Sequence, residues 1–133
     1  MNPTLWLICG PPGTGKTFLA KILANSLGGM NAAVSADDYF TDKDGTYRFI
    51  RERLSDAHAY CQHRADELMA LKCANVIVHN TLLRPWERKP YHDLAAKRDY
   101  FVQTVHLKHL RPEGNVHNVP KEKVIEMLAR HEF

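Results

Sequence analysis

The chain alternates short apolar runs with longer stretches in which apolar residues recur every three or four positions. The short runs have the length and composition of buried strands, and they lie at about 4–9, 32–35, 75–80 and 100–107. The periodic stretches predict amphipathic helices at about 16–27, 47–71, 91–99 and 120–130. Strands that alternate with helices form a parallel sheet with right-handed crossovers, so the pattern predicts an α/β fold.

Several side chains make this pattern testable. The longest helix should carry one apolar stripe, formed by Leu54, Ala57, Cys61, Ala65 and Leu68. His58 lies beside that stripe, which favours a packing role over a ligand role. Pro90 would break or restart a helix, so 81–90 is predicted to be a loop or a broken helix. The last helix should turn three apolar residues inward, namely Val124, Ile125 and Leu128.

The sequence GPPGTGKT, residues 10–17, separates the first strand from the first helix. It fits the P-loop pattern G-x-x-x-x-G-K-[ST] at every fixed position. Glycines let successive N–H groups cradle phosphate oxygens, and the helix that follows offers its positive end to the same anion. Lys16 would neutralise the β- and γ-phosphates, and Thr17 would place its hydroxyl on Mg²⁺. The alternative is a glycine-rich turn that binds nothing, and the strand, loop and helix in register argue against it. We therefore expect ATP and Mg²⁺ to bind at Gly10, Pro11, Pro12, Gly13, Thr14, Gly15, Lys16, Thr17 and Phe18.

Polar residues also follow two other predicted strands. Asp37 and Asp38 come directly after the second strand, and His79 and Asn80 end the third. The carboxyl ends of parallel strands meet at one edge of a sheet, where ligands bind. A carboxylate there can hold an acceptor hydroxyl in line with the γ-phosphate and take its proton. Asp37 is therefore a candidate general base and metal ligand, and the alternative is a helix cap or a solvated turn acid.

Several classes of P-loop protein do not fit this sequence. A GTPase would carry a guanine-reading Asn-Lys-x-Asp motif after a later strand, and the chain has none. A ring-forming motor ATPase would need an acidic pair after the second strongly apolar strand, where this chain has His79 and Asn80. It would also need a helical lid domain, for which the chain is too short. Small P-loop kinases remain.

Composition adds few constraints. The 133 residues suffice for one compact domain over 1–133, and 44% hydrophobic with 25% charged residues is typical of a soluble globular protein. The formal net charge of +3 permits a nucleic-acid partner without requiring one. No apolar run approaches membrane-spanning length and no signal segment is present, so we expect a cytoplasmic protein that does not bind a membrane. The three cysteines lack metal-type spacing, which favours free core thiols at Cys9, Cys61 and Cys73.

A basic segment follows the third strand. Its cations lie near Trp86 and Tyr91, and they are Arg84, Arg88, Lys89, Lys97 and Arg98. Cations with interleaved aromatic residues can follow a single nucleic-acid strand. The alternative, a solvated amphipathic helix with Trp86 in the core, is favoured.

Several segments together resemble one family. They are GPPGTGKT at 10–17, SADDYF at 35–40, DGTY at 44–47, AH at 57–58, VIV followed by NT within 76–81, WE at 86–87 with PY at 90–91, and HNVP-x-EK at 117–123. The chain resembles the AAA-type ATP-binding, P-loop kinase-like group that is related to the kinase domain of phage polynucleotide kinase. The resemblance implies that Asp37 is the general base toward a nucleic-acid 5′-hydroxyl. It also implies that an arginine in a lid-like loop at about 108–118 clamps the phosphoryl group. Arg111 is the only arginine in that loop, and the alternative for it is a solvated loop residue.

The chain departs from this family at three points. The lid region between Leu107 and His117 is short, which would reduce the phosphate clamp. Phe40 stands where the polynucleotide kinases have an arginine that touches the nucleic acid. Relatives commonly carry an aspartate near the end of the third strand, where this chain has His79 and Asn80. Histidine does not replace that charge, so Mg²⁺ would depend on Thr17, the phosphates and Asp37.

The residues and the resemblance together predict a P-loop NTPase fold with a small parallel sheet of four or five strands in the order 2-3-1-4. The expected function is transfer of the ATP γ-phosphoryl group to a hydroxyl, with the 5′ end of a single-stranded nucleic acid as favoured acceptor and Lys16, Asp37 and Arg111 as catalytic residues. Two alternatives stay open. One is an ATP-binding switch or interaction module whose catalysis has decayed, and the other is a kinase of a small molecule or a protein. The oligomeric state also stays open.

Overall fold

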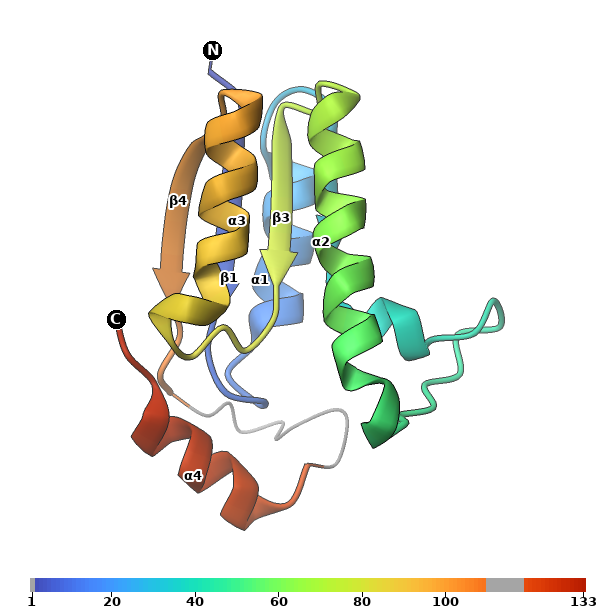
Figure 1. The fold of residues 1–133 in the computed structure, drawn as a ribbon, viewed down its shortest axis with the longest axis vertical. Coiled ribbons are helices and arrows are strands. Elements are labelled where there is room, and N and C mark those ends of the chain that lie inside the picture. The colour runs from blue at the N-terminus through green and yellow to red at the C-terminus, as the bar shows by residue number, and fades with distance from the viewer. Residues whose placement is uncertain (1, 110–118) are drawn as a thin grey trace.

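The computed structural model describes residues 2–109 and 119–133. Four parallel strands form one sheet in the order β2-β3-β1-β4 (Figure 1). Their bounds are Thr4–Cys9 for β1, Asn31–Val34 for β2, Asn75–His79 for β3 and Phe101–His106 for β4. The predicted α/β class, P-loop topology and strand order 2-3-1-4 are confirmed.

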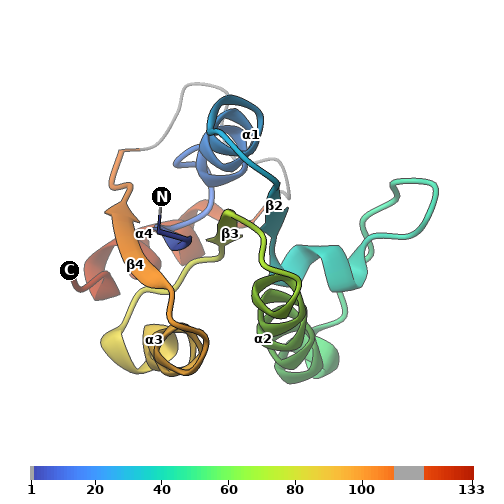
Figure 2. The same ribbon diagram turned by 90° about the horizontal axis from the view of Figure 1, so that it is seen from above.

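Helices cover both faces of the sheet. Within the described residues the α-helices are Lys16–Ser26 for α1, Leu54–Ala70 for α2, Pro85–Arg98 for α3 and Lys121–Arg130 for α4. Two short 3₁₀ helices precede α2, namely Ala36–Phe40 for η1 and Arg51–Arg53 for η2. Seen from above, α1 lies on one face of the sheet, and α2 and α3 lie on the other (Figure 2). Helix α4 lies beyond the carboxyl ends of the strands, at the edge that carries the P-loop (Figure 1).

The central strands are buried on both faces because each carries apolar side chains at successive positions. Leu7 and Val78 belong to the larger cluster, which packs beneath α2 and α3. Ile8 and Ile77 point the other way and pack with Ala20 of α1. Strands covered on both sides read as continuous apolar runs, which is why the sequence revealed them.

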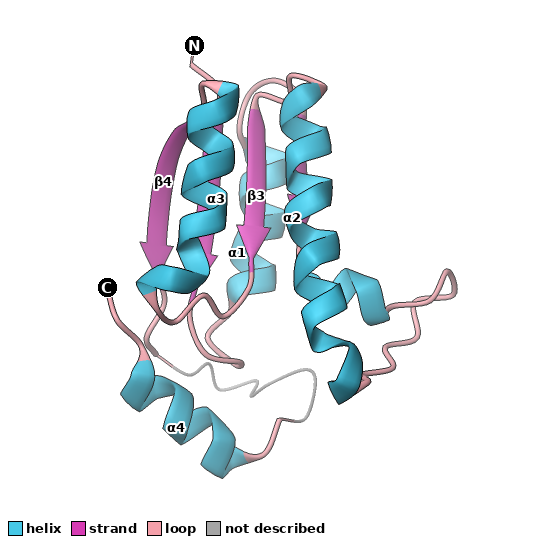
Figure 3. Ribbon diagram, viewed as in Figure 1, coloured by secondary structure: helices cyan, strands magenta, loops and turns pink. Residues whose placement is uncertain are grey.

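The start of α2 differs from the prediction of a helix from residue 47. Residues 41–50 instead fold back onto η1, where Thr41 and Tyr47 form an antiparallel bridge. The backbone N–H of Arg48 donates to the carbonyl of Phe40 over 2.8 Å. Figure 3 shows this segment as a protruding loop before α2. Helix α2 begins only at Leu54, and that side chain is exposed rather than part of the predicted apolar stripe.

The predicted break at Pro90 is wrong, because α3 runs through it. Pro85 occupies a first-turn position, and Glu87 Oε2 accepts a hydrogen bond from the backbone N–H of Arg84 over 2.8 Å, which starts the helix upstream of Pro90. Pro90 then removes a single intrahelical bond, to the carbonyl of Trp86. The favoured placement of Trp86 in the core is also wrong, since this residue is 72% exposed.

The other packing predictions have mixed outcomes. The three cysteines are buried and free, as predicted. His58 is half-buried beside the buried side chains of Ala57 and Cys61. Helix α4 buries Val124 as predicted, but Ile125 on the same helix is exposed. None of the helices in the described residues combines the length and apolar character needed to cross a membrane.

Candidate functional site

The P-loop connects the end of β1 to the first turn of α1. Two backbone hydrogen bonds fix its base: the N–H of Gly10 donates to the carbonyl of Thr81, and the N–H of Leu107 donates to the carbonyl of Cys9. A Cβ atom at Gly10 would overlap the carbonyl oxygen of Leu107, so this position requires glycine. Gly15 caps α1 with a φ of 91°, a left-handed conformation that suits glycine. The loop therefore has a backbone shape that can cradle phosphate oxygens.

Lys16 is the first residue of α1, and its side chain folds back over the loop. Its Nζ donates a hydrogen bond to the carbonyl of Pro11 over 2.9 Å, and Thr14 Oγ1 donates to the same carbonyl over 2.8 Å. Burial lowers the pKa of Lys16 from 10.5 to about 8, and the Asp37 carboxylate opposes that change. A lysine whose charge is poorly solvated in the free protein gains most when an anion arrives.

The two acids that follow β2, Asp37 and Asp38, have different hydrogen-bond partners in η1. Asp38 Oδ2 accepts a hydrogen bond from the backbone N–H of Ser35 over 3.0 Å, which makes Asp38 the cap of this helix. Asp37 is half-buried, and its Oδ1 accepts a hydrogen bond from the hydroxyl of Tyr47 over 3.2 Å. Burial and the Asp37 charge raise the pKa of Tyr47 to about 12, so the phenol remains a donor at neutral pH. The capping alternative thus applies to Asp38.

Asn80 is a buried link that the sequence did not reveal. Its Oδ1 accepts a hydrogen bond from the backbone N–H of Ala36 over 2.8 Å, and its Nδ2 lies 3.4 Å from Cys61 Sγ and 3.5 Å from the hydroxyl of Tyr91. Asn80 therefore ties the end of β3 to the first residue of η1, and so helps to position Asp37. The signal was a polar residue directly after a buried strand, but its partners are distant in sequence.

His79, the last residue of β3, lies beside the P-loop because β3 pairs with β1, with His79 opposite Ile8. Its Nδ1 is 3.4 Å from Thr17 Oγ1. Burial lowers the pKa of His79, which keeps the imidazole neutral at pH 7. This strand end thus carries a neutral histidine in place of an acid, and the histidine contacts Thr17, whose hydroxyl was expected to bind the metal ion.

The described residues contain no cluster of three or more His, Cys, Asp or Glu side chains that could hold a metal ion. A divalent cation would therefore need the exposed Thr17 hydroxyl together with ligands that a nucleotide brings. The P-loop residues fit that arrangement, since a glycine-shaped backbone, a poorly solvated lysine and a hydroxyl face one edge. Gly13 also has a positive φ, of 85°, and Phe18, the last residue of the predicted set, is exposed.

The two other residues singled out by the family resemblance are Phe40 and Arg111. Phe40 is 5% exposed, and its ring packs edge-on against Tyr39 and Phe49 at centroid distances of 5.3 and 5.2 Å. Phe40, where the resemblance led us to expect an arginine, is thus part of the core. Arg111 and most of the lid-like loop fall within 110–118, outside the described residues.

The basic residues of α3 and its N-cap are paired within the chain. Lys89 Nζ lies 2.9 Å from Asp93, Arg98 Nε lies 2.9 Å from Asp66, and Lys97 Nζ lies 3.6 Å from the same carboxylate. Arg84 pairs with Glu132, and Arg88 is buried, with its Nη1 donating to the carbonyl of Leu82 over 2.7 Å. These pairings agree with an amphipathic helix and not with a surface that follows a nucleic-acid strand.

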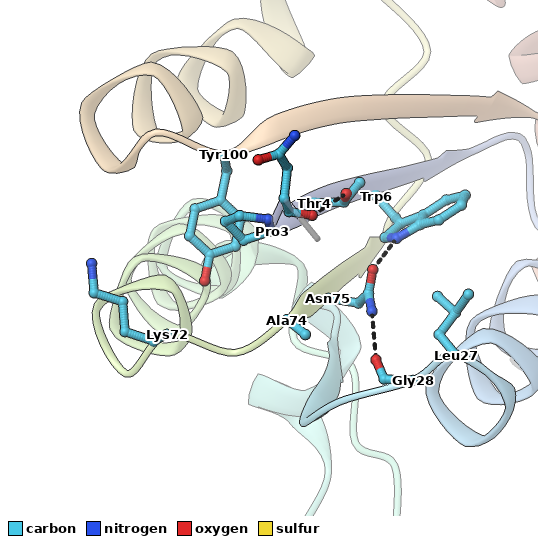
Figure 4. Close-up of a pocket in the computed structure, with 10 residues that line it drawn as sticks. Pro3, Thr4, Trp6, Leu27, Gly28, Lys72, Ala74, Asn75 and Tyr100 are labelled. Atoms are coloured by element: carbon cyan, nitrogen blue, oxygen red, sulfur yellow. Dashed lines mark hydrogen bonds between the residues drawn. The ribbon is translucent and has the colours of Figure 1, made fainter.

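A separate cavity of about 520 Å³ lies at the amino ends of the strands, away from the P-loop (Figure 4). Trp6 Nε1 donates to Asn75 Oδ1 over 2.9 Å at its wall, and Tyr100 and Lys72 line it as well. Asn75 Nδ2 in turn donates to the carbonyl of Gly28 over 3.4 Å. This cavity shares no residue with the phosphate-binding edge.

Comparison with known proteins now decides the family. The model of the AAA domain family matches residues 5–113. The chain belongs to this family. Within it, the chain is a P-loop kinase-like ATP-binding domain.

The relatives differ widely in what they do. The chain is 36% identical over 135 residues to the human NEDD4-binding protein 2, covering 96% of this chain but only 8% of that protein. A chain of the Pnkp1/Rnl/Hen1 RNA repair complex is 14% identical with a TM-score of 0.69, covering 97% of this chain and 44% of that one. A gluconokinase from Sinorhizobium meliloti is 14% identical with a TM-score of 0.66, covering 98% and 76%. At these identities the two structures establish the fold alone.

Proposed function

We propose that the chain transfers the γ-phosphoryl group of ATP to a hydroxyl, and that the favoured acceptor is the 5′-hydroxyl of a single-stranded nucleic acid. The observation that carries the proposal is the position of Asp37. Asp37 lies in η1, shortly after β2, and its carboxylate influences the pKa of Lys16, whereas the neighbouring Asp38 caps η1. One acid is therefore oriented toward the nucleotide edge while the other holds the helix in place.

These residues support a definite sequence of bond changes. Asp37 accepts the proton of the acceptor hydroxyl, and the acceptor oxygen forms a bond to the γ-phosphorus as the bond to the β–γ bridging oxygen breaks. Lys16 stabilises the charge that collects on the phosphate oxygens, and Arg111 would add a bidentate clamp. Tyr47 donates to Asp37 Oδ1 and so helps to orient the carboxylate. The products are ADP and a phosphate monoester.

Mg²⁺ fits this site through Thr17, as the P-loop pattern implies. A divalent cation held there would neutralise charge that builds up on the phosphate oxygens during transfer. The protein would contribute the Thr17 hydroxyl, and the nucleotide and water would supply the other ligands.

Exposed aromatic rings next to Asp37 support a nucleic-acid acceptor. Tyr39, Tyr60 and Phe49 are 37, 39 and 51% exposed, and they come from η1, α2 and the loop between them. The Tyr39 and Tyr60 rings lie 5.8 Å apart, and the exposed Arg51 follows Phe49 along the chain, whereas Arg53 is paired with Asp56 at 3.3 Å. Aromatic rings with neighbouring cations stack and hold single-stranded bases without sequence preference. Likeness to a chain of an RNA repair complex agrees with this choice of acceptor.

A second candidate has one observation in its favour. The strand that follows α2 ends in His79 and Asn80, without an acid, and Asn80 is engaged in structural hydrogen bonds. A site without that carboxylate can bind ATP and turn over slowly or not at all. The alternative function is then an ATP-dependent interaction module.

Transfer of labelled γ-phosphate to DNA and RNA oligonucleotides tests the proposal. Oligonucleotides with a 5′-hydroxyl should become labelled, whereas the same strands with a 5′-phosphate and a free 3′-hydroxyl should not. Asp37→Asn should abolish labelling, and the matched variant Asp38→Asn should retain most of it. Labelling of neither strand, with ATP binding established by calorimetry, would reject the nucleic-acid acceptor and favour the interaction module or another acceptor.

A further inference from the structure

The contact between His79 and Thr17 brings an imidazole nitrogen to the place where the cation of the nucleotide is expected. Thr17 is in the first turn of α1, and His79 ends β3, so two different elements deliver the two side chains. Their facing atoms, Thr17 Oγ1 and His79 Nδ1, are 3.4 Å apart. His79 is half-buried at this strand end, and the carboxylates of Asp37 and Asp38 both act on its charge.

The separation suits two ligands of one cation. Two ligands at right angles, each about 2.1 Å from an octahedral ion, are about 3.0 Å apart. The observed separation of 3.4 Å requires a movement of about 0.4 Å, which a side-chain rotation supplies. An exposed hydroxyl and an imidazole can therefore occupy neighbouring positions on the same ion.

Thr17 paired with His79 should prefer different metal ions from a threonine paired with a carboxylate. Mg²⁺ prefers oxygen ligands and gives up its water reluctantly, whereas first-row transition metal ions bind imidazole strongly. Replacing a charged oxygen ligand by a neutral nitrogen ligand lowers the affinity for Mg²⁺ and favours the transition metals. The described residues contain no cluster of three His, Cys, Asp or Glu side chains, so the nucleotide must supply further ligands.

We propose that His79 is a direct ligand of the divalent cation that accompanies the nucleotide, and that it gives this site a preference for first-row transition metal ions over Mg²⁺. The inference rests on nucleotide binding as stated in the proposed function, and it does not depend on which acceptor is used.

Electron paramagnetic resonance can detect the ligand directly. The protein is labelled with ¹⁵N at its histidines and mixed with Mn²⁺ and the methylene analogue of ATP, whose adenine nitrogens remain ¹⁴N. We expect a ¹⁵N coupling to Mn²⁺ that is present in the wild type, lost in His79→Asp and kept in His92→Asn, a control at an exposed histidine of α3. Absence of the coupling in the wild type, or its persistence in His79→Asp, would overturn the inference.

Metal preference provides the second readout. Affinities for Co²⁺ and Mg²⁺ are measured by calorimetry in the presence of the analogue. The ratio of Co²⁺ to Mg²⁺ affinity should fall about tenfold or more in His79→Asp, and also in the uncharged His79→Asn, because the imidazole is lost in both. An unchanged ratio in both variants would contradict a ligand role.

The outcomes separate the two proposals. If the analogue binds and no histidine coupling is found, the inference fails and the proposed function stands. If the wild type does not bind the analogue with any of these ions, the proposed function fails and the inference fails with it.

Discussion

Replacing Lys16 by methionine should stabilise the nucleotide-free protein while removing its response to ATP. The Lys16 ammonium group lies over the P-loop, where burial lowers its pKa from 10.5 to about 8. Its hydrogen bond to the carbonyl of Pro11 does not compensate for lost hydration. Methionine keeps the length and apolar character of the stem without the charge.

The size of this effect follows from the pKa. A tenfold change in proton affinity corresponds to about 1.4 kcal/mol, so lowering the pKa from 10.5 to about 8 destabilises the native state by about 3 kcal/mol at pH 7. Below pH 8 the lysine is charged in both states and the penalty is complete. Between pH 8 and 10.5 only the unfolded chain binds the proton, so the stability of the wild type rises with pH. The advantage of Lys16→Met should therefore shrink to about 1 kcal/mol at pH 10.

Urea denaturation at pH 7 and pH 10 measures both effects. Lys16→Met should unfold at higher urea than the wild type at pH 7, by about 2–3 kcal/mol, with a smaller difference at pH 10. Lys21→Met, at an exposed lysine of the same helix, is the matched control and should change stability by less than about 0.5 kcal/mol. ATP at about 100 times its Kd should stabilise the wild type by about 2.7 kcal/mol and Lys16→Met by far less. A variant that is less stable than the wild type at pH 7, or a difference that does not depend on pH, would refute this reasoning.

Three further substitutions probe the supports of the site. Asn80→Ala should lower the free energy of unfolding by about 1–3 kcal/mol and slow transfer, since η1 loses its link to β3; urea denaturation and a transfer assay measure the two effects. Tyr47→Phe removes the donor to Asp37 and should slow transfer roughly tenfold at unchanged ATP affinity, and an equal loss of affinity would argue against this positioning role. Arg88→Met should cost about 2–4 kcal/mol, because the carbonyl of Leu82 is left buried without its donor, and a loss of less than 1 kcal/mol by denaturation would contradict that account.

Much of the fold could be predicted because its signals are local. The β-branched run that forms β3 and the glycines around Lys16 can be recognised from short stretches of sequence, without knowledge of distant contacts. The start of α2 could not be predicted this way. Tyr47 has an ordinary helical environment in sequence, but its backbone pairs with Thr41 and its hydroxyl binds Asp37. Both contacts depend on how the loop returns to η1.

The candidate site likewise has some features with local sequence signals and others that depend on contacts between distant segments. The sequence and the family resemblance already favoured Asp37 over Asp38, but only the three-dimensional structure supplies the hydrogen bond by which Asp38 caps η1. The partners of Asn80 come from η1, α2 and α3, and no sequence spacing connects them. Trp86 looked like a core residue by size, yet the buried face of α3 is defined by Arg88 and Tyr91 at helical spacing. The roles of Asp38 and Asn80 therefore depend on contacts that appear only once the chain is folded.

Single-turnover transfer from ATP to a 5′-hydroxyl oligonucleotide, with ATP affinity measured in parallel, tests the central claim most directly. The comparison is between the wild type and Asp37→Asn, with Asp38→Asn as the control that weakens the cap of η1 and keeps the Asp37 carboxylate. The account predicts that Asp37→Asn binds ATP as the wild type does and transfers about 100- to 10,000-fold more slowly. Transfer by Asp37→Asn at the wild-type rate would contradict it, because the proton would then leave by another route.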